Sequence, residues 1–232
     1  NHINFSEGGR DTFNTHSTGL LNILQAVNLK KIRRVVQIGS SDEYGNLESP
    51  QNELMRELPF SPYSLAKLTC TNMLQMLFRT EKLPVVVIRL FLVYGEGQDF
   101  KRFLPQVIKG CLLNEKFPTT KGQQIRDFCY VDDVVEGILK ALITEERVVG
   151  EIFNIASGNP VKIKTIIEKI VNITGSGKPL YGERKYRQGE SMSLYADINK
   201  ARKILNWEPK ITIDIGLEKT IKYYKKYFEL NK

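Results

Sequence analysis

The sequence is poor in the residues that build disulfide frameworks and metal centres. Its 232 residues include three cysteines and two histidines, and these lack the close spacing of zinc ligands. An odd number of scattered cysteines is typical of a reducing compartment. No stretch approaches the roughly 18 consecutive apolar residues of a membrane span, and no signal-peptide pattern is visible. We therefore predict a soluble cytoplasmic protein with neither a metal site nor a membrane segment.

The formal charge lies on the basic side, at +8. The lysines are spread along the chain, mostly over the C-terminal helical segments, and do not gather in one block. Dispersed positive charge is typical of a solvated surface, and it also suits an anionic small substrate. We predict no nucleic-acid partner.

Alternating strand-like and helix-like segments predict an α/β fold with a parallel sheet. Short apolar runs predict buried strands at 34–39, 85–91 and 151–156. Helical periodicity predicts helices at 12–29, 63–79, 103–113, 132–144, 163–174, 199–205 and 214–228. We expect residues 1–95 to form the sheet domain, with some later segments returning to it, and residues 96–232 to form mainly a smaller lobe.

Tyr63 and Lys67 form a Y-x-x-x-K pattern at the start of the predicted helix 63–79. Positions i and i+4 share one helix face, so both side chains are expected to point into one cleft. An ammonium beside a phenol lowers the pKa of the phenol and prepares it for proton transfer. Ser40 lies upstream, at the end of an apolar run. Taken alone, the pair is better explained as the start of an amphipathic helix.

The surrounding segments make the pattern specific. Residues 35–45 read V-V-Q-I-G-S-S-D-E-Y-G, residues 59–67 read P-F-S-P-Y-S-L-A-K, and residues 89–95 read R-L-F-L-V-Y-G. Further matches are G-Q-Q-I-R-D-F at 122–128 and Y-R-Q-G-E at 186–190. In this order the segments resemble the extended short-chain dehydrogenase/reductase family, specifically its nucleotide-sugar epimerases, dehydratases and 4-keto reductases. The resemblance covers essentially the whole chain.

The resemblance implies a fold, a cofactor and a reaction. The fold is an NAD(P)-binding Rossmann fold, a doubly wound parallel sheet, with a smaller C-terminal α/β substrate-binding lobe. The cofactor is NAD or NADP, and the substrate is a nucleotide-diphosphate sugar. Ser40, Tyr63 and Lys67 take the places of the catalytic residues, and Lys67 also that of the contact to the nicotinamide ribose. The implied activity is hydride transfer at C4 of the hexose, as a 4-epimerase or a 4-keto reductase.

One family feature is not in the sequence. Relatives carry a G-x-x-G-x-x-G turn after an early strand, where glycines and a helix N-terminus bind the cofactor pyrophosphate. The sequence begins Asn1-His2-Ile3 and contains no such turn. We expect the chain to be the C-terminal part of a longer protein whose first strands are missing here.

The resemblance also implies residues that bind the substrate. Arg126 and Arg187 match arginines that hold the nucleotide diphosphate, which suits the bidentate pairing of guanidinium with phosphate. Arg102 is a weaker third candidate, and Phe117 lies on the expected edge for the base.

Ser41 and Asp42 bear on the type of reaction. Family dehydratases have an acid pair or a Glu where this chain has Ser40, Ser41 and Asp42. A carboxylate shorter by one methylene cannot reach the same proton, so we expect dehydration to be disfavoured. Asp42 is either a substrate contact or a plain loop carboxylate.

Two positions depart from the family pattern. Leu92 replaces an Asn that often contacts the substrate, and His16 replaces an Asn near the cofactor and the proton relay. His16 can donate or accept a hydrogen bond and could titrate near neutral pH.

The resemblance further implies a homodimer, built from the predicted helices 12–29 and 63–79. The second helix has more apolar surface than one sheet contact should need, through Leu68, Met73, Leu74, Met76 and Leu77. Two alternatives to the main hypothesis remain open. One is a nucleotide-sugar 4,6-dehydratase, and the other is a non-catalytic protein that binds NAD(P) or sugar nucleotides.

Overall fold

The computed structural model describes residues 4–187 and 189–230. Residues 1–3 of the predicted domain 1–95 and Gln188 of the 186–190 segment lie outside the described residues. The chain divides into two compact units. The first comprises residues 1–91, 135–155 and 196–208, and the second comprises 92–134, 156–195 and 209–232.

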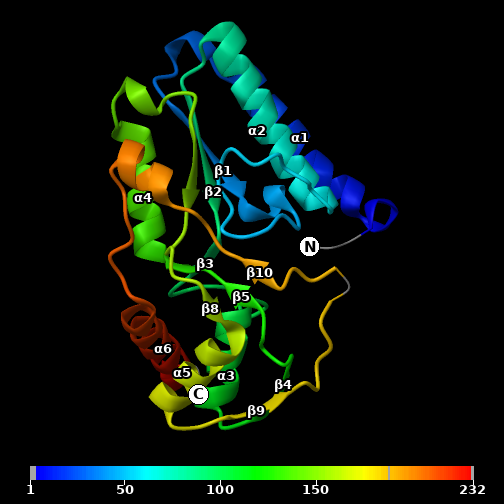
Figure 1. Cartoon of the computed structure of the whole chain (residues 1–232), viewed down its shortest axis with the longest axis vertical. Helices are drawn as coiled ribbons and strands as arrows, with labels where there is room; N and C mark the ends of the chain where they lie inside the picture. The colour runs from blue at the N-terminus through cyan, green and yellow to red at the C-terminus, as the bar shows by residue number, and fades with distance from the viewer. Residues whose placement is uncertain (1–3, 188, 231–232) are drawn as a thin grey trace. The chain divides into compact units, whose positions relative to one another are not determined.

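The first unit is built on a parallel sheet with the order β1-β2-β7 (Figure 1). Its strands are β1 (Val35–Ser40), β2 (Val85–Leu90) and β7 (Ile152–Ile155). Val85 to Ile88 are fully buried, as expected for β-branched residues in the central strand of a covered sheet. Ser40 pairs with Leu90. Because the strands are parallel, Ser40 lies at the carboxyl edge of the sheet, where α/β proteins place their sites.

Two long helices lie side by side in this unit, α1 (Gly9–Ala26) and α2 (Pro62–Glu81) (Figure 1). Their apolar faces pack Leu24 and Leu74 against the sheet residues Val85 and Val87. The N-terminus of α2 has two local signals. The Ser61 side chain accepts a hydrogen bond from the Ser64 backbone N–H, and Pro62 occupies the first turn, where a missing N–H costs nothing.

The bounds of α1 differ from the predicted range 12–29. The helix begins at Gly9, directly after Gly8, whose φ of 108° turns the chain into it. It ends at Ala26 because Val27 is extended. Asn28 then caps a separate 3₁₀ helix, η2 (Leu29–Lys31), through its side chain.

Several shorter elements complete the first unit. They are η1 (Phe5–Glu7), η3 (Ser41–Tyr44), η4 (Glu146–Val148) and a π-helical turn, η5 (Ala201–Leu205). Helix α4 (Val131–Ile143) begins in the second unit and continues into the first. Residues 201–205 of the predicted helix 199–205 form the π-helical turn η5, and Asn206 follows it in the left-handed conformation.

The second unit packs three helices and several short strands around one core. Its helices are α3 (Phe103–Leu112), α5 (Ile163–Thr174) and α6 (Ile213–Leu230). Its strands are β3 (Leu92–Tyr94), β4 (Lys116–Thr119), β5 (Ile125–Arg126), β6 (Phe128–Tyr130), β8 (Val161–Lys162), β9 (Lys178–Tyr181) and β10 (Ser193–Leu194).

These strands form the pairs β3-β6 and β4-β9 and the three-stranded set β10-β5-β8. The sequence patterns predict none of these short strands. Two to four residues are too few for the alternation of apolar and polar residues that reveals a strand.

Candidate active site

Ser40 occupies the last position of β1, and its hydroxyl is held by the turn that follows. Its Oγ accepts a hydrogen bond from the Asp42 backbone N–H at 3.2 Å. Because Oγ is the acceptor there, its own hydrogen can be donated to a substrate oxygen. Ser41 is buried, and Asp42 is half-buried in η3. The sequence thus places a hydroxyl at the carboxyl edge of the sheet.

Tyr63 and Lys67 lie one turn apart at the start of α2. The Lys67 Nζ atom is 5.8 Å from the centroid of the Tyr63 ring. It also donates a hydrogen bond to the Ile38 backbone oxygen at 3.0 Å. Ile38 precedes Ser40 by two residues in β1, so this bond ties the helix to the strand that carries Ser40. The structure therefore brings the three predicted catalytic residues to the same end of β1.

The pKa of the Lys67 ammonium is lowered on balance, although its surroundings act on it in opposite directions. Burial lowers the pKa of the Lys67 ammonium, whereas the nearby Cys70 and Glu43 raise it. An ammonium that keeps its charge in a half-buried position stabilises a neighbouring phenolate.

His16 reaches this group from α1. Its ring lies edge-on to the Tyr63 ring, with the centroids 5.4 Å apart. Burial lowers the pKa of the His16 imidazole, and the positive charge of Lys67 lowers it further. His16 is therefore neutral at pH 7, where it can serve as a hydrogen-bond donor or acceptor.

Next to Ser40 lies a buried ion pair, formed by Glu43 and Arg89, that the sequence patterns do not reveal. The Glu43 carboxylate accepts a hydrogen bond from Arg89 Nε at 2.9 Å, and both side chains are fully buried. Arg89 Nη2 also lies 2.5 Å from Glu57 Oε1. The guanidinium carbon of Arg89 lies 4.6 Å from the centroid of the Tyr44 ring. Arg89 could have indicated this ion pair from sequence alone, because a charged residue inside an otherwise apolar strand needs a buried partner.

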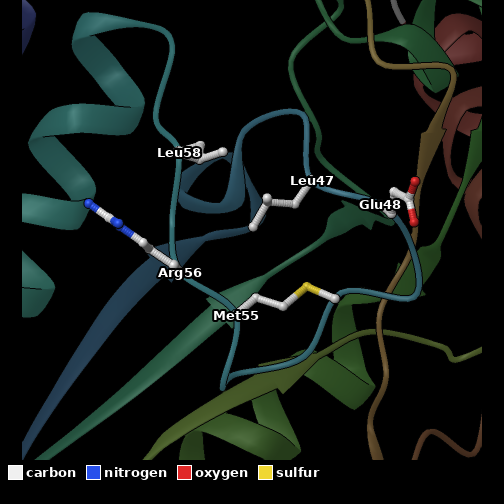
Figure 2. Close-up of a pocket in the computed structure, with 5 residues that line it drawn as sticks. All are labelled: Leu47, Glu48, Met55, Arg56 and Leu58. Atoms are coloured by element: carbon white, nitrogen blue, oxygen red, sulfur yellow. The ribbon is translucent and has the colours of Figure 1, made fainter.

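The same unit has a surface pocket on the segment between η3 and α2. Figure 2 shows its five lining residues: Leu47, Glu48, Met55, Arg56 and Leu58. The pocket has a volume of about 550 Å³. None of the predicted site residues lines it, and its walls are mainly apolar side chains.

Arg126 lies in the second unit, on β5, with its side chain only 11% exposed. Its Nη2 donates to Glu190 Oε1 at 2.7 Å, and its Nη1 donates to the Ile125 backbone oxygen. Arg187 is exposed, and its backbone oxygen accepts a hydrogen bond from the Glu190 N–H. Glu190 thus connects the two predicted diphosphate residues. The sequence analysis had not predicted the pairing of Glu190 with Arg126.

The other predicted substrate residues of this unit lie on separate elements. Arg102 is exposed and caps α3. Phe117 is half-buried on β4, with its ring packed against Gly110 of α3 and the core of the unit. Leu92 begins β3 and is 37% exposed.

Over 4–187 and 189–230, no three His, Cys, Asp or Glu side chains are grouped so that they could hold a metal ion. Within the same ranges, no helix has the length and hydropathy needed to cross a bilayer.

The residues around Tyr63 fit the nicotinamide end of a dinucleotide. An ammonium has three N–H donors, so Lys67 can keep its bond to Ile38 and still donate to ribose hydroxyls. The half-buried aromatic rings of Tyr63 and His16 provide an apolar wall beside it.

Comparison with known proteins gives the same result for family and fold. The model of the NAD dependent epimerase/dehydratase family matches residues 4–156. The UDP-glucuronate 4-epimerase of Thermodesulfobacterium geofontis is 31% identical over 93% of this chain. The chain spans 66% of the length of that relative.

Solved structures are also similar. The UDP-glucose 4-epimerase of Thermotoga maritima, crystallised with UDP-glucose, superposes with a TM-score of 0.87 at 27% identity, over 95% of this chain and 74% of that one. The UDP-glucuronic acid 4-epimerase of Bacillus cereus, in complex with UDP-glucuronic acid and NAD, gives 0.82 at 28% identity, over 96% and 68%. The predicted Rossmann-type α/β fold is confirmed.

Proposed function

The chain belongs to the NAD dependent epimerase/dehydratase family, and from this membership we propose that its protein binds NAD or NADP and a nucleotide-diphosphate sugar. The reaction is hydride transfer at C4 of the hexose, as a 4-epimerase or a 4-keto reductase. The observation that supports it best is the convergence of Ser40, Tyr63 and Lys67 at one end of β1. This convergence supplies a proton carrier, a positive charge and a hydroxyl donor within one unit.

Tyr63 moves the proton. Its phenolic oxygen accepts the proton of the sugar hydroxyl as the alcohol becomes a ketone, and returns it in the reverse step. The positive charge of Lys67 stabilises the negative charge that develops on the Tyr63 oxygen when it gives up its proton. The Ser40 hydroxyl donates a hydrogen bond to the same sugar oxygen and fixes its position.

Lys67 has a second role, because it would hold the nicotinamide ribose. His16 and Tyr63 would complete the wall beside the nicotinamide. When bound, the nicotinamide supplies the site with a hydride acceptor and donor. The residues of this chain bind it, orient it and carry the proton.

The second unit would hold the nucleotide diphosphate. Arg126 and Arg187 offer guanidinium groups that pair with phosphate oxygens, and Leu92, Arg102 and Phe117 are the further substrate contacts proposed. In the first unit, Ser41 and Asp42 directly follow Ser40 and are also proposed as substrate contacts. The protein is further proposed to be a homodimer, and to be cytoplasmic.

The two alternatives have less support. A 4,6-dehydratase needs a carboxylate with the reach of Glu, whereas Asp42 is one methylene shorter. A non-catalytic binding protein has no need of the complete set of Ser40, Tyr63 and Lys67 at one end of β1.

The test is an activity screen of the protein as its gene encodes it. UDP-, dTDP- and CDP-hexoses are incubated with NAD, the corresponding 4-keto nucleotide sugars are incubated with NADH and with NADPH, and sugar products are followed by proton NMR. A 4-epimerase interconverts two sugars without net change in the cofactor, whereas a 4-keto reductase consumes NADPH or NADH. No turnover of any nucleotide sugar, with folded protein, would refute the proposal.

A further inference from the structure

The Glu43 carboxylate joins three elements of the first unit at one point. Its Oε1 accepts a hydrogen bond from the Ser40 backbone N–H at 2.8 Å. Its Oε2 accepts from Thr71 Oγ1 and from Arg89 Nε, each at 2.9 Å. These three donors belong to the end of β1, to α2 and to β2. Glu43 itself is fully buried.

Thr71 makes this contact relevant to the site. It lies on α2 one turn beyond Lys67 and two turns beyond Tyr63, so the three side chains share one face of the helix. The carboxylate therefore links the Ser40 backbone to the helix face that carries the other two candidate catalytic residues. The bond from Lys67 to Ile38 is a second link between the same helix and strand.

Neighbouring residues leave space for the Glu43 carboxylate and neutralise its charge. A Cβ atom at Gly39 would lie 2.6 Å from Glu43 Oε1, so a side chain at that position would displace the carboxylate. Arg89 neutralises Glu43, and Glu57 is the second carboxylate on Arg89. Burying such ions is weak evidence for stability, because apolar residues of similar volume often do as well. The buried charges of Glu43 and Arg89 are better explained by a role in fixing the positions of Ser40 and α2 than by a contribution to stability.

We propose that Glu43 is a positioning residue, whose carboxylate holds Ser40 at a fixed distance from Tyr63 and Lys67. The proposal rests on the proposed function. Glu43 acts through Ser40 and Thr71, and it has no contact with substrate or cofactor in this role. Misplacement of a reacting group by about 1 Å can lower a rate ~10²-fold. A loosened link is therefore expected to reduce turnover without weakening substrate binding.

Thr71 is the better position for the test, because substitution of Glu43 would leave Arg89 buried with reduced compensation. Thr71→Val removes the hydroxyl that bonds Glu43 and keeps the shape of the side chain. Thr71→Ser retains the hydroxyl. Thr69→Val is the matched control on the same helix, because the Thr69 hydroxyl bonds only to Leu65 O of its own helix turn.

The measurements are kcat and KM for the nucleotide sugar, the melting temperature, and amide hydrogen exchange at Ser40. We expect Thr71→Val to lower kcat on the order of tenfold with KM unchanged, and to speed exchange of the Ser40 amide. Thr71→Ser should restore both, and Thr69→Val should match the unmodified protein.

Equal kcat in Thr71→Val and Thr69→Val would overturn the proposal. So would a loss of kcat that Thr71→Ser does not restore, or one that follows a fall in melting temperature and a rise in KM. If the unmodified protein turns over no nucleotide sugar, the proposed function fails first. The exchange rate of the Ser40 amide then decides the positioning contact by itself, and an unchanged rate refutes it.

Discussion

At the scale of single residues, the hydroxyl of Tyr63 is the atom on which the chemistry depends. We expect Tyr63→Phe to lower kcat by ~10²–10⁴-fold, because positioned proton transfer contributes about that much to a rate. Binding of the nucleotide sugar should stay close to normal, since the ring remains. Steady-state kinetics and calorimetry check the two parts separately. Turnover near that of the unmodified protein would remove Tyr63 from the mechanism.

His16 gives a second prediction at this scale, on pH. The unfolded chain binds a proton at His16 near the usual pKa of 6.5, whereas the folded protein binds it only at lower pH. As pH falls below 6.5, the unfolded state takes up more protons, so the free energy of unfolding decreases. Above that pH the effect is absent, because His16 is neutral in both states.

The measurement is the melting temperature of the unmodified protein against that of His16→Asn, across about pH 7 to pH 5. The difference in favour of the unmodified protein should shrink as the solution becomes more acidic. An NMR titration assigned with the same variant gives the pKa of His16 directly. A value above 6.5 would contradict the structure.

At the scale of secondary structure elements, β5 and the loop that carries Glu190 act as a pair. In the proposed complex, Arg126 exchanges its bond to Glu190 for a bond to a phosphate of the nucleotide sugar. Arg126→Ala should weaken binding of a nucleotide sugar by about 1.5–3 kcal/mol, the value of a hydrogen bond between charged groups. Glu190→Gln replaces the ion pair with Arg126 by a weaker, neutral hydrogen bond and is expected to tighten binding.

Arg187→Ala should weaken binding by a similar amount, and Arg184→Ala serves as its control because it removes an exposed charge from the same loop. Calorimetry with the same nucleotide sugar compares all four variants. Unchanged affinity in both Arg126→Ala and Arg187→Ala would show that the diphosphate is held elsewhere.

The elements also show what sequence patterns can predict. Helix 163–174 was predicted with its observed bounds, and β1 and β2 within a residue, because long periodic or β-branched segments carry their own signal. The strands of the second unit were missed, since two to four residues hold too little periodicity. Their positions depend on tertiary pairing, such as that of β5 with β10 and β8.

The candidate site was predictable to a similar degree. Ser40, Tyr63 and Lys67 were recognised because their residue types and spacing are typical of one chemistry. The pairing of Glu43 with Thr71 and Arg89 was not predicted, because these residues lie 28 and 46 positions from Glu43 in sequence. Only the packing of β1, β2 and α2 brings such donors to one carboxylate.

At the scale of the whole molecule, the structure changes the reasoning behind the predicted homodimer. Five apolar residues of α2 were expected to provide the dimer surface: Leu68, Met73, Leu74, Met76 and Leu77. Leu68 and Leu74 are buried, and Met73 and Leu77 pack against the core of the first unit. The expectation was wrong for Leu68 and Leu74, which the chain itself buries, whereas Met73 and Leu77 are half-buried. Met76 alone is substantially exposed, at 42%.

Other exposed apolar side chains on α1 and α2 keep the homodimer as a proposal. Leu21 and Ile23 on α1 are 44% and 62% exposed, and Leu65 on α2 is 44% exposed. Leu65 and Met76 are separated by three helical turns and lie on one face of α2. A two-fold axis through this face would pair each patch with its copy. Apolar side chains in such a patch favour association when they leave water together.

The prediction is that light scattering at micromolar concentration gives twice the mass of one chain, and that Met76→Glu shifts it toward the monomer. A carboxylate in the interface would be desolvated without a partner, and its copy would lie near it across the axis. Ile143→Glu is the matched control, because Ile143 is a 77% exposed apolar residue on α4 and belongs to neither α1 nor α2. It should leave the dimer intact. A monomeric mass for the unmodified protein would refute the dimer, and equal dissociation of both variants would place the interface elsewhere.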